Sequence, residues 1–298
     1  MDSSSIPKLP FRPHDAHKGL FGHGVLIGGV KGLSGAIAIA GMSCLRSGAG
    51  LVTVAVPECC HAIVATLDPH YMTLPLPCDL AGSFSAEAES KLSTFLQPAT
   101  RQYKPCVAIG PGLGRSEASD KMVTNLFESS PYSLVVDADG LNALSESRVW
   151  ERLIRGDSNP NPWERILTPH PGEWERLSGV PATDREGQIS AAKSIAAQTH
   201  CIIVLKGNKT VITDGAQCFV NSTGNASMAV GGSGDCLTGI ITALVCQKMS
   251  GIDAARLGTY LHGLAGDLAH TELETPSTLA MDLIRFLPAA FRALKSKQ

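Results

Sequence analysis

Short apolar runs alternate with longer amphipathic segments along most of the chain. Several runs are rich in β-branched residues and end at Gly, Pro or a polar residue, which is the pattern of buried strands. The expected strands cover residues 25–28, 51–56, 72–76, 106–109, 133–137, 166–168, 201–205, 210–213 and 217–220. Pro75 inside the third run fits an edge strand. The Asp214-Gly215 pair predicts a hairpin turn between the last two strands.

Segments with helical spacing stand between and after these strands. Helices are expected over residues 35–47, 57–66, 85–96, 116–129, a short stretch ending at 177, 184–199, 233–249, 252–272 and 279–294. Residues 148–163 are rich in Asn and Pro and are expected to form an irregular connection, and polar residues 1–16 a loose arm. This order predicts an α/β fold with a mostly parallel sheet covered by helices, in one domain over residues 17–298.

Glycine-bearing or polar segments follow many of the expected strands. They cover residues 28–36, 110–114, 137–142, 168–173, 206–210 and 221–235. The carboxyl ends of parallel strands meet at one edge of a sheet, where open α/β folds bind their ligands. The sequence therefore predicts a binding crevice at this edge.

Residues 231–235, Gly-Gly-Ser-Gly-Asp, open the first of the late helices. Gly231, Gly232 and Gly234 allow backbone N–H groups to converge beside the unpaired N–H groups of the helix, which makes a site for an anion. Ser233 and Asp235 have a structural interpretation as a cap and a first-turn residue. A carboxylate next to a bound phosphate is unfavourable unless it has a chemical task, so a catalytic role for Asp235 stays open beside the structural one.

Other polar residues at the strand ends also have two interpretations. Lys206 could reach phosphate oxygens or simply extend into solvent. His170 lies in a rigid turn between two prolines and could hold a ligand or be an ordinary loop histidine. Glu173 could contact Mg²⁺ through water or occupy the first turn of a helix.

Composition narrows the class of ligand. The 298 residues carry a net charge of −2, which gives no reason to expect a nucleic acid or an anionic membrane as a partner. The nine cysteines form no C-x-x-C pair, the N-terminus lacks the features of a signal peptide, and no apolar run approaches the ~20 residues of a membrane span. We therefore expect a cytoplasmic protein that binds small molecules. No Gly-Lys dipeptide occurs, which excludes a Walker A loop.

Ten segments together make the chain resemble a known family, the stand-alone ADP/ATP-dependent NAD(P)H-hydrate dehydratases of the ribokinase-like superfamily. Any one segment is weak, but their order over residues 17 to about 285 is specific. The matching segments are residues 17–19, 26–29 with 34–36, 46–54, 109–114, 137–142, 168–173, 206–207, 221–225, 231–235 with 237–239, and 260–267.

The resemblance implies a three-layer α/β/α sandwich that repairs hydrated nicotinamide cofactors. Family members phosphorylate the hydroxyl of the S-epimer of hydrated NADH or NADPH with ADP or ATP, then lose phosphate to restore NADH or NADPH. Mg²⁺, a homotetramer and a separate epimerase for the other epimer are implied as well.

The same resemblance assigns site residues. It makes Asp235 the catalytic base, which would also contact the substrate, and suggests that Glu173 contacts Mg²⁺ through water. The residues implied for the nucleotide are Lys206, Gly207, Asn208, Lys209, Thr210, Asn225, Gly231, Gly232, Ser233 and Gly234. Those implied for the hydrated dinucleotide, besides Asp235, are Ala36, Gly112, Gly114 and His170.

Two departures from the family pattern concern the nucleotide loop. Ala226-Ser227 stands where the family usually has Pro-Gly, and Val230 replaces a usual Thr. The main rival function is a ribokinase-like kinase that releases a phosphorylated vitamin precursor or sugar. A nucleotide-binding protein without catalysis is a second rival, which an intact Asp235 disfavours.

Overall fold

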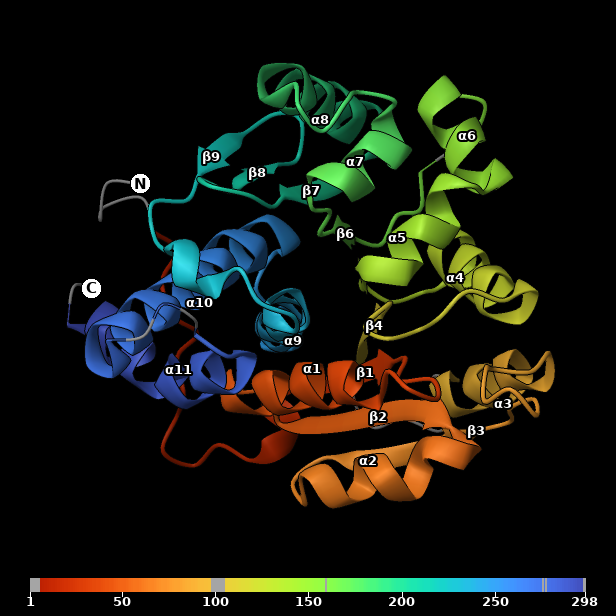
Figure 1. The fold of residues 1–298 in the computed structure, drawn as a ribbon, viewed down its shortest axis with the longest axis horizontal. Coiled ribbons are helices and arrows are strands. Elements are labelled where there is room, and N and C mark those ends of the chain that lie inside the picture. Colours follow the sequence, from red (N-terminus) through yellow and green to blue (C-terminus); the bar gives the residue numbers. More distant parts are fainter. Residues whose placement is uncertain (1–5, 98–104, 159, 275, 277, 297–298) are drawn as a thin grey trace.

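A nine-stranded sheet runs through the molecule in the order β3-β2-β1-β4-β5-β6-β7-β8-β9 (Figure 1). The computed structural model describes residues 6–97, 105–158, 160–274, 276 and 278–296. The strands are β1 His23–Ile27, β2 Leu51–Pro57, β3 Met72–Leu76, β4 Pro105–Ile109, β5 Leu134–Val136, β6 Arg165–Leu167, β7 Cys201–Leu205, β8 Val211–Thr213 and β9 Cys218–Val220. All pairs from β3 to β7 are parallel, whereas β8 is antiparallel to both of its neighbours.

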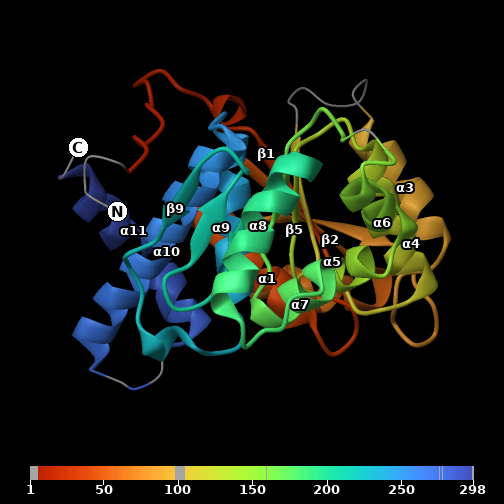
Figure 2. The same ribbon diagram turned by 90° about the horizontal axis from the view of Figure 1, so that it is seen from above.

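Helices cover both faces of this sheet. The helices are α1 Ser34–Arg46, α2 His61–Leu67, α3 Glu87–Leu96, α4 Glu117–Ser129, α5 Ala138–Ser145, α6 Arg148–Arg155, α7 Pro171–Ser178, α8 Arg185–Thr199, α9 Ser233–Cys246, α10 Gly251–Leu273 and α11 Ala280–Lys295. Residues of α3 to α8 share one core with the sheet, and residues of α1, α2, α9 and α10 share the other. α11 packs outside α9 and α10, and Figure 2 shows it at the opposite side of the molecule from α3 and α4.

Alternation along the strands produces the two cores. Val25 and Ile27 of β1 lie in the core beneath α3 to α8, and Leu26 between them lies in the other core. Successive side chains of a strand point to opposite faces, so strands buried on both faces are apolar throughout. This is why the runs recognised in the sequence are continuous rather than alternating.

Close packing of α1 against α9 sets the position of the late glycine segment. A Cβ on Gly239 of α9 would lie 2.0 Å from Ser43 Oγ and 2.1 Å from the Ala40 carbonyl oxygen of α1, so only glycine allows this approach. The contact fixes α9 over the middle of the sheet. Its first residues, 233–235, therefore reach the carboxyl ends of the central strands.

The expected strands are all found, and most of the expected helices begin and end within a few residues of their predicted bounds. The irregular connection expected over residues 148–163 is wrong in its first half, which forms α6. Ser147 caps this helix by accepting the Trp150 N–H at 3.2 Å, and Trp150 and Leu153 are buried on one face. The Asn and Pro residues that suggested a loop follow the helix, after Gly156 ends it in a left-handed conformation.

The N-terminal arm has neither helix nor strand over residues 6–16. Ile6 is nevertheless buried against α9, α10 and α11, and the Arg12 guanidinium lies 3.8 Å from the centre of the Phe21 ring. Residues 1–5 of the expected arm lie outside the described residues. Among the helices that the structure describes, none combines the length and hydropathy needed to span a bilayer.

Candidate active site

The carboxyl ends of five neighbouring strands, β1, β4, β5, β6 and β7, form one edge of the sheet. Backbone hydrogen bonds continue the parallel pairing beyond the strands. The N–H of Gly110 donates to the carbonyl oxygen of Ile27 at 3.2 Å, that of Asp137 to the carbonyl oxygen of Ile109 at 3.1 Å, and that of Thr168 to the carbonyl oxygen of Val136 at 3.1 Å. These bonds hold the polar segments side by side. The crevice predicted from the sequence therefore lies at this edge.

A cavity of about 1030 Å³ opens between this edge, the turn after β7, the loop after β9 and the first turn of α9. Its lining includes most of the residues that the sequence suggested for a nucleotide: Lys206, Gly207, Asn208, Lys209, Thr210, Asn225, Gly232, Ser233 and Gly234. His170 and Asp235 line it as well. Gly231 is exposed and does not line the cavity.

Lys206 is held inside this cavity by a buried carboxylate. Its ammonium nitrogen lies 2.9 Å from Asp137 Oδ1, and the side chain of Asp137 is only 2% exposed. Thr238 Oγ donates to the other carboxylate oxygen at 2.8 Å. Burial alone would raise the pKa of Asp137, but the charge and hydrogen bond of Lys206 lower it overall. Burial alone would lower the pKa of Lys206, but the carboxylates of Asp137 and Glu173 raise it overall. Lys206 is thus a fixed cation at the cavity wall.

The first turn of α9 presents free backbone donors beside that cation. Gly232 precedes the helix with φ of 88°, and no side chain caps it. The N–H groups of Gly234 and Asp235 have no acceptor among the described residues. A Cβ on Gly234 would lie 3.3 Å from Lys206 Nζ, so the helix terminus and the ammonium face the same space. Free amides at a helix N-terminus next to a lysine are suited to an anion such as phosphate.

Asp235 in the same turn has an unusual acidity. Burial raises its pKa, the negative charge of Asp137 raises it further, and Lys206 offsets only part of this, so that the pKa is about 7. A carboxyl group with a pKa near the working pH can accept a proton and release it again. The structure thus gives Asp235 the acidity of a general base, whereas an ordinary first-turn Asp would be strongly acidic.

His170 and Glu173 form a capping box at the start of α7. His170 Nδ1 accepts the N–H groups of Gly172 at 3.0 Å and Glu173 at 3.3 Å, and Glu173 Oε2 accepts the His170 N–H at 2.7 Å. Because Nδ1 is an acceptor, the neutral ring carries its proton on Nε2. Burial, followed by the charges of Lys206 and Arg176, lowers the pKa of His170, so the ring is a neutral donor.

Glu173 is buried, and its carboxylate already serves this cap. Burial raises the pKa of Glu173. The positive charge of Lys206, whose Nζ lies 3.8 Å from Oε2, lowers this pKa but does not cancel the rise. In the part of the chain that the structure describes, no three His, Cys, Asp or Glu side chains could hold a metal ion by themselves. Mg²⁺ in nucleotide sites keeps several waters and binds mainly through phosphates and one or two carboxylates, which these residues do allow.

The other residues suggested for the substrate lie along the same edge but outside the cavity lining. A Cβ on Gly112 would lie 3.1 Å from Ala36 Cβ, so the loop after β4 contacts the first turns of α1. The N–H of Gly114 donates to Asp139 Oδ2 at 2.9 Å. Ala36, Gly112 and Gly114 therefore form a separate surface toward β1.

The loop that departs from the family pattern is held by its own hydrogen bonds. Ser227 Oγ contacts Asn225 Oδ1 at 2.5 Å and Thr278 Oγ1 at 2.7 Å, and Thr278 N–H donates to the Ser227 carbonyl at 2.9 Å. Ser227 thus ties the loop to the segment before α11. Val230 leaves the following turn intact, since its carbonyl accepts the Ser233 N–H at 3.4 Å.

Sequence reasoning missed three residues that the structure places at this site: Asp137, Thr238 and His262. Asp137 stood in a recognised segment at the end of a strand, and that was the only signal for it. Thr238 and His262 also stood in matching segments, 237–239 and 260–267, but inside expected helices they look like ordinary core or face residues. Their proximity to the site depends on how α9 and α10 pack.

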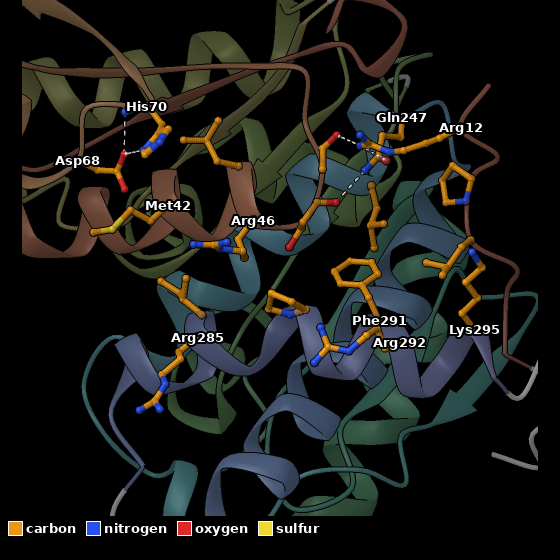
Figure 3. Close-up of a pocket in the computed structure, with 18 of the residues that line it drawn as sticks. Arg12, Met42, Arg46, Asp68, His70, Gln247, Arg285, Phe291, Arg292 and Lys295 are labelled. Carbon is orange, nitrogen blue, oxygen red and sulfur yellow. Dashed lines mark hydrogen bonds and ion pairs between the residues drawn. The ribbon is translucent and has the colours of Figure 1, made fainter. Parts of the chain in front are cut away.

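A larger cavity, of about 1370 Å³, shares no lining residue with the first. Figure 3 shows side chains that line it. It is bounded by the N-terminal arm, the last turn of α1 and one face of α11, and Arg46, Arg292 and Lys295 line it. These cations lie in the last turns of α1 and α11, where they stabilise the helix C-termini. This position gives them a structural explanation, so the smaller cavity is the candidate active site.

The chain is similar to proteins whose family is known. A family model described as NAD(P)H-hydrate dehydratase matches residues 24–289. The chain is 41% identical over 293 residues to a bifunctional NAD(P)H-hydrate repair enzyme of Moorella thermoacetica, covering 97% of this chain and 53% of that protein. It is 32% identical to an ADP-dependent (S)-NAD(P)H-hydrate dehydratase of Bacillus subtilis, covering 95% of this chain and 94% of that protein.

The crystal structure of an ADP/ATP-dependent NAD(P)H-hydrate dehydratase of Bacillus subtilis, co-crystallised with ATP and Mg²⁺, is also similar. It superposes with a TM-score of 0.79 at 31% identity, covering 96% of this chain and 94% of that chain. The chain spans about half the length of the bifunctional relatives that it matches, 53% for the first of them.

Proposed function

The chain belongs to the NAD(P)H-hydrate dehydratase family and has its ribokinase-like fold, and we propose that it is a hydro-lyase that restores hydrated NADH and NADPH. The observation that carries this proposal is Asp235, a carboxylate with a pKa of about 7 in the same helical turn as two backbone N–H groups that have no acceptor among the described residues. A kinase needs the same base to activate a hydroxyl, so the reaction product distinguishes the two functions.

The proposed chemistry has two steps. The Asp235 carboxylate takes the proton from the ring hydroxyl as the hydroxyl oxygen bonds to the terminal phosphorus of ADP or ATP, and the bond from that phosphorus to the rest of the nucleotide breaks. AMP or ADP leaves. The carbon–oxygen bond of the new phosphate ester then breaks, and phosphate departs with the bonding electrons. The neighbouring carbon gives a proton to water, which restores the double bond of NADH or NADPH.

We assign the ligands to the two sides of Asp235. The residues from Lys206 to Thr210, with Asn225 and Gly232 to Gly234, would hold the nucleotide, and Lys206 with the α9 amides would bind its terminal phosphates. Ala36, Gly112, Gly114 and His170 would hold the hydrated dinucleotide. The Nε2 proton of His170 would donate to an acceptor atom of that substrate, which is consistent with the acceptor role of Nδ1 in the helix cap.

Mg²⁺ would bind between the phosphates and the acidic side chains, with Glu173 contacting it through water. Mg²⁺ in this position supplies neutralisation of the charge that develops on the phosphate oxygens. The occupied capping role of Glu173 favours such an indirect contact over direct coordination. Equilibrium titration of the protein with ATP, with and without Mg²⁺, would show the contribution of the metal to binding, and Glu173→Gln should reduce that difference.

The test of the proposed function is regeneration of reduced nicotinamide absorbance from hydrated NADH, with Mg²⁺ and either ADP or ATP. We expect absorbance to return together with free phosphate. Asp235→Asn should lower the rate ~10²–10⁴-fold, whereas Asp157→Asn, on the exposed surface, should leave it unchanged. A stable phosphorylated product without release of phosphate would support a kinase instead, and no reaction with either nucleotide would refute both.

Three further properties complete the proposal. The bifunctional relatives are named as repair enzymes with two activities, which supports a functional link between this chain and an epimerase. All nine cysteines are free, which is consistent with the reducing cytoplasm. Family resemblance makes a homotetramer the expected assembly, and light scattering of the purified protein would measure it.

A further inference from the structure

One segment that supports the family resemblance has no role in the proposed chemistry. Residues 260–267 lie in the middle of α10. His262, Gly263, Gly266 and Asp267 are spaced so that they share one face of the helix. That face contacts the loop after β9: a Cβ on Gly263 would lie 2.4 Å from Thr223 Oγ1, and a Cβ on Gly266 would lie 2.2 Å from Met228 Sδ. The helix face is therefore built to approach the nucleotide side of the cavity.

His262 reaches the anion site from this face. Its Nε2 lies 3.3 Å from Ser233 Oγ, and both residues line the cavity. Ser233 is the first residue of α9, and its hydroxyl does not cap the helix. Burial lowers the pKa of His262 to about 4, so its ring is neutral near pH 7, with one donor and one acceptor nitrogen.

The chemistry of phosphate decides the direction of this hydrogen bond when a nucleotide is bound. Phosphate oxygens only accept hydrogen bonds at neutral pH, so Ser233 contributes to binding only if its O–H donates to them. Its oxygen then accepts from a neighbouring donor, and Nε2–H of His262 is the group in position. A histidine with its proton on Nε2 would thus orient the hydroxyl toward the ligand.

Asp267 supports the same side of the cavity one turn further along. Its Oδ2 accepts the Gly224 N–H at 2.9 Å, and its Oδ1 accepts Asn225 Nδ2 at 2.8 Å. Both oxygens therefore hold the loop that carries Asn225. This carboxylate lies beside the loop and does not line the cavity.

We propose that α10 positions the nucleotide through two residues, His262 by orienting the Ser233 hydroxyl toward a phosphate and Asp267 by holding the Asn225 loop. Both are positioning residues, and the proposal rests on the proposed nucleotide-dependent function. It requires a phosphate-bearing nucleotide as the ligand and does not require the dehydration step.

The decisive experiment is a double-mutant cycle measured by calorimetric titration with ADP and ATP in the absence of hydrated cofactor. Ser233→Ala and His262→Asn should each weaken binding about tenfold, because each removes the oriented donor to a charged phosphate. The double variant should be little weaker than either single variant, since both changes remove the same interaction. His262→Gln, whose longer side chain can place an amide N–H near the position of Nε2, should recover part of the affinity.

His200→Asn is the matched control. His200 is an exposed residue at the end of α8 with φ of 55°, a conformation that Asn tolerates. The His200→Asn variant should therefore bind nucleotide as the native protein does. In turnover assays, His262→Asn and Asp267→Asn should raise the nucleotide KM with a much smaller change in kcat. A purely structural effect would lower the melting temperature without a selective rise in the nucleotide KM.

Three results would overturn the proposal: additive effects in the cycle, unchanged affinity in His262→Asn, or a Gln variant no better than the Asn variant. Failure of the proposed function would look different. The native protein would then bind ADP or ATP with the predicted dependence on His262 and Ser233 but would regenerate no reduced nicotinamide.

Discussion

Replacing Asp235 by Asn should inactivate the protein and at the same time stabilise it. The side chain is mostly buried next to the negative charge of Asp137, and both effects disfavour its ionised form. Asn removes the charge and keeps the size of the side chain. Asp235→Asn is therefore expected to be more stable than the native protein at the pH where activity requires the negative charge of Asp235. Such a trade-off between stability and activity is common at active sites.

The magnitude follows from the acidity of Asp235. An ordinary Asp has a pKa of 3.8, and that of Asp235 is about 7. The folded state therefore binds this proton more tightly than the unfolded chain, and stability falls as pH rises through this interval. Each tenfold difference in proton affinity is worth about 1.36 kcal/mol. The raised pKa of Asp235 therefore lowers the free energy of unfolding by about 1.6 kcal/mol at pH 5, where only the unfolded chain ionises, and by about 4 kcal/mol at pH 8, where the folded protein also holds the ionised carboxylate.

Urea unfolding of the ligand-free protein at the two pH values would measure this difference. Asp235→Asn should exceed the native protein in free energy of unfolding by a small margin at pH 5 and by a larger one at pH 8. Asp157→Asn provides the control for the substitution itself and should change little at either pH, because Asp157 is exposed and its side chain has no hydrogen-bond or ion-pair partner among the described residues.

The reasoning would be refuted by a variant that is less stable than the native protein at pH 8. An advantage that does not grow between pH 5 and pH 8 would also contradict it. Either result would mean that the Asp235 carboxylate is well stabilised when ionised. It would then be too weak a base for the proposed proton transfer.

Three other predictions follow from the same contacts. The turnover rate should fall about tenfold between pH 8 and pH 6 as Asp235 gains its proton, and a rate profile that is flat over this range would contradict its role as base. Lys206→Met leaves the buried Asp137 carboxylate without its charged partner and should lower the free energy of unfolding by about 3–5 kcal/mol; adding Asp137→Asn should restore part of the lost stability in the same urea assay. Gly110→Ala should prevent stable folding, because Gly110 has φ of 132° and a Cβ would lie 1.7 Å from the Asp137 carbonyl oxygen. Gly35→Ala, where a Cβ meets nothing within 4 Å, should melt at the native temperature or slightly above it.

Local signals were sufficient for most of the fold. The run 51–56 is apolar because β2 is buried on both faces, and Asp184 marks the start of α8 because its side chain accepts the Gly187 N–H at 2.9 Å. Such signals lie within a few residues of the element that they predict. The missed helix α6 had equally local signals in Ser147, Trp150 and Leu153, but the Asn and Pro residues that follow outweighed them.

The site was predicted less completely, because its contacts are not local. Lys206, His170 and Asp235 were recognised from segments at strand ends. Nothing near Asp137 in the sequence shows that it lies 2.9 Å from Lys206, which is 69 residues away. Its second partner, Thr238, is 101 residues away. Those distances depend on the strand order and on the close packing of α1 and α9, which a pattern of residue types does not encode directly.

The different roles of two carboxylates depend on these non-local contacts. Asp137 and Asp235 both lie close to Lys206, which is a single ammonium group. Asp137 makes the direct contact with the ammonium and also accepts from Thr238, so its pKa is lowered. Asp235 is left with burial and the repulsion of Asp137, so its pKa rises to about 7. In the sequence each is one aspartate in a segment that also contains glycine, and only the geometry makes one a fixed counter-ion and the other a base.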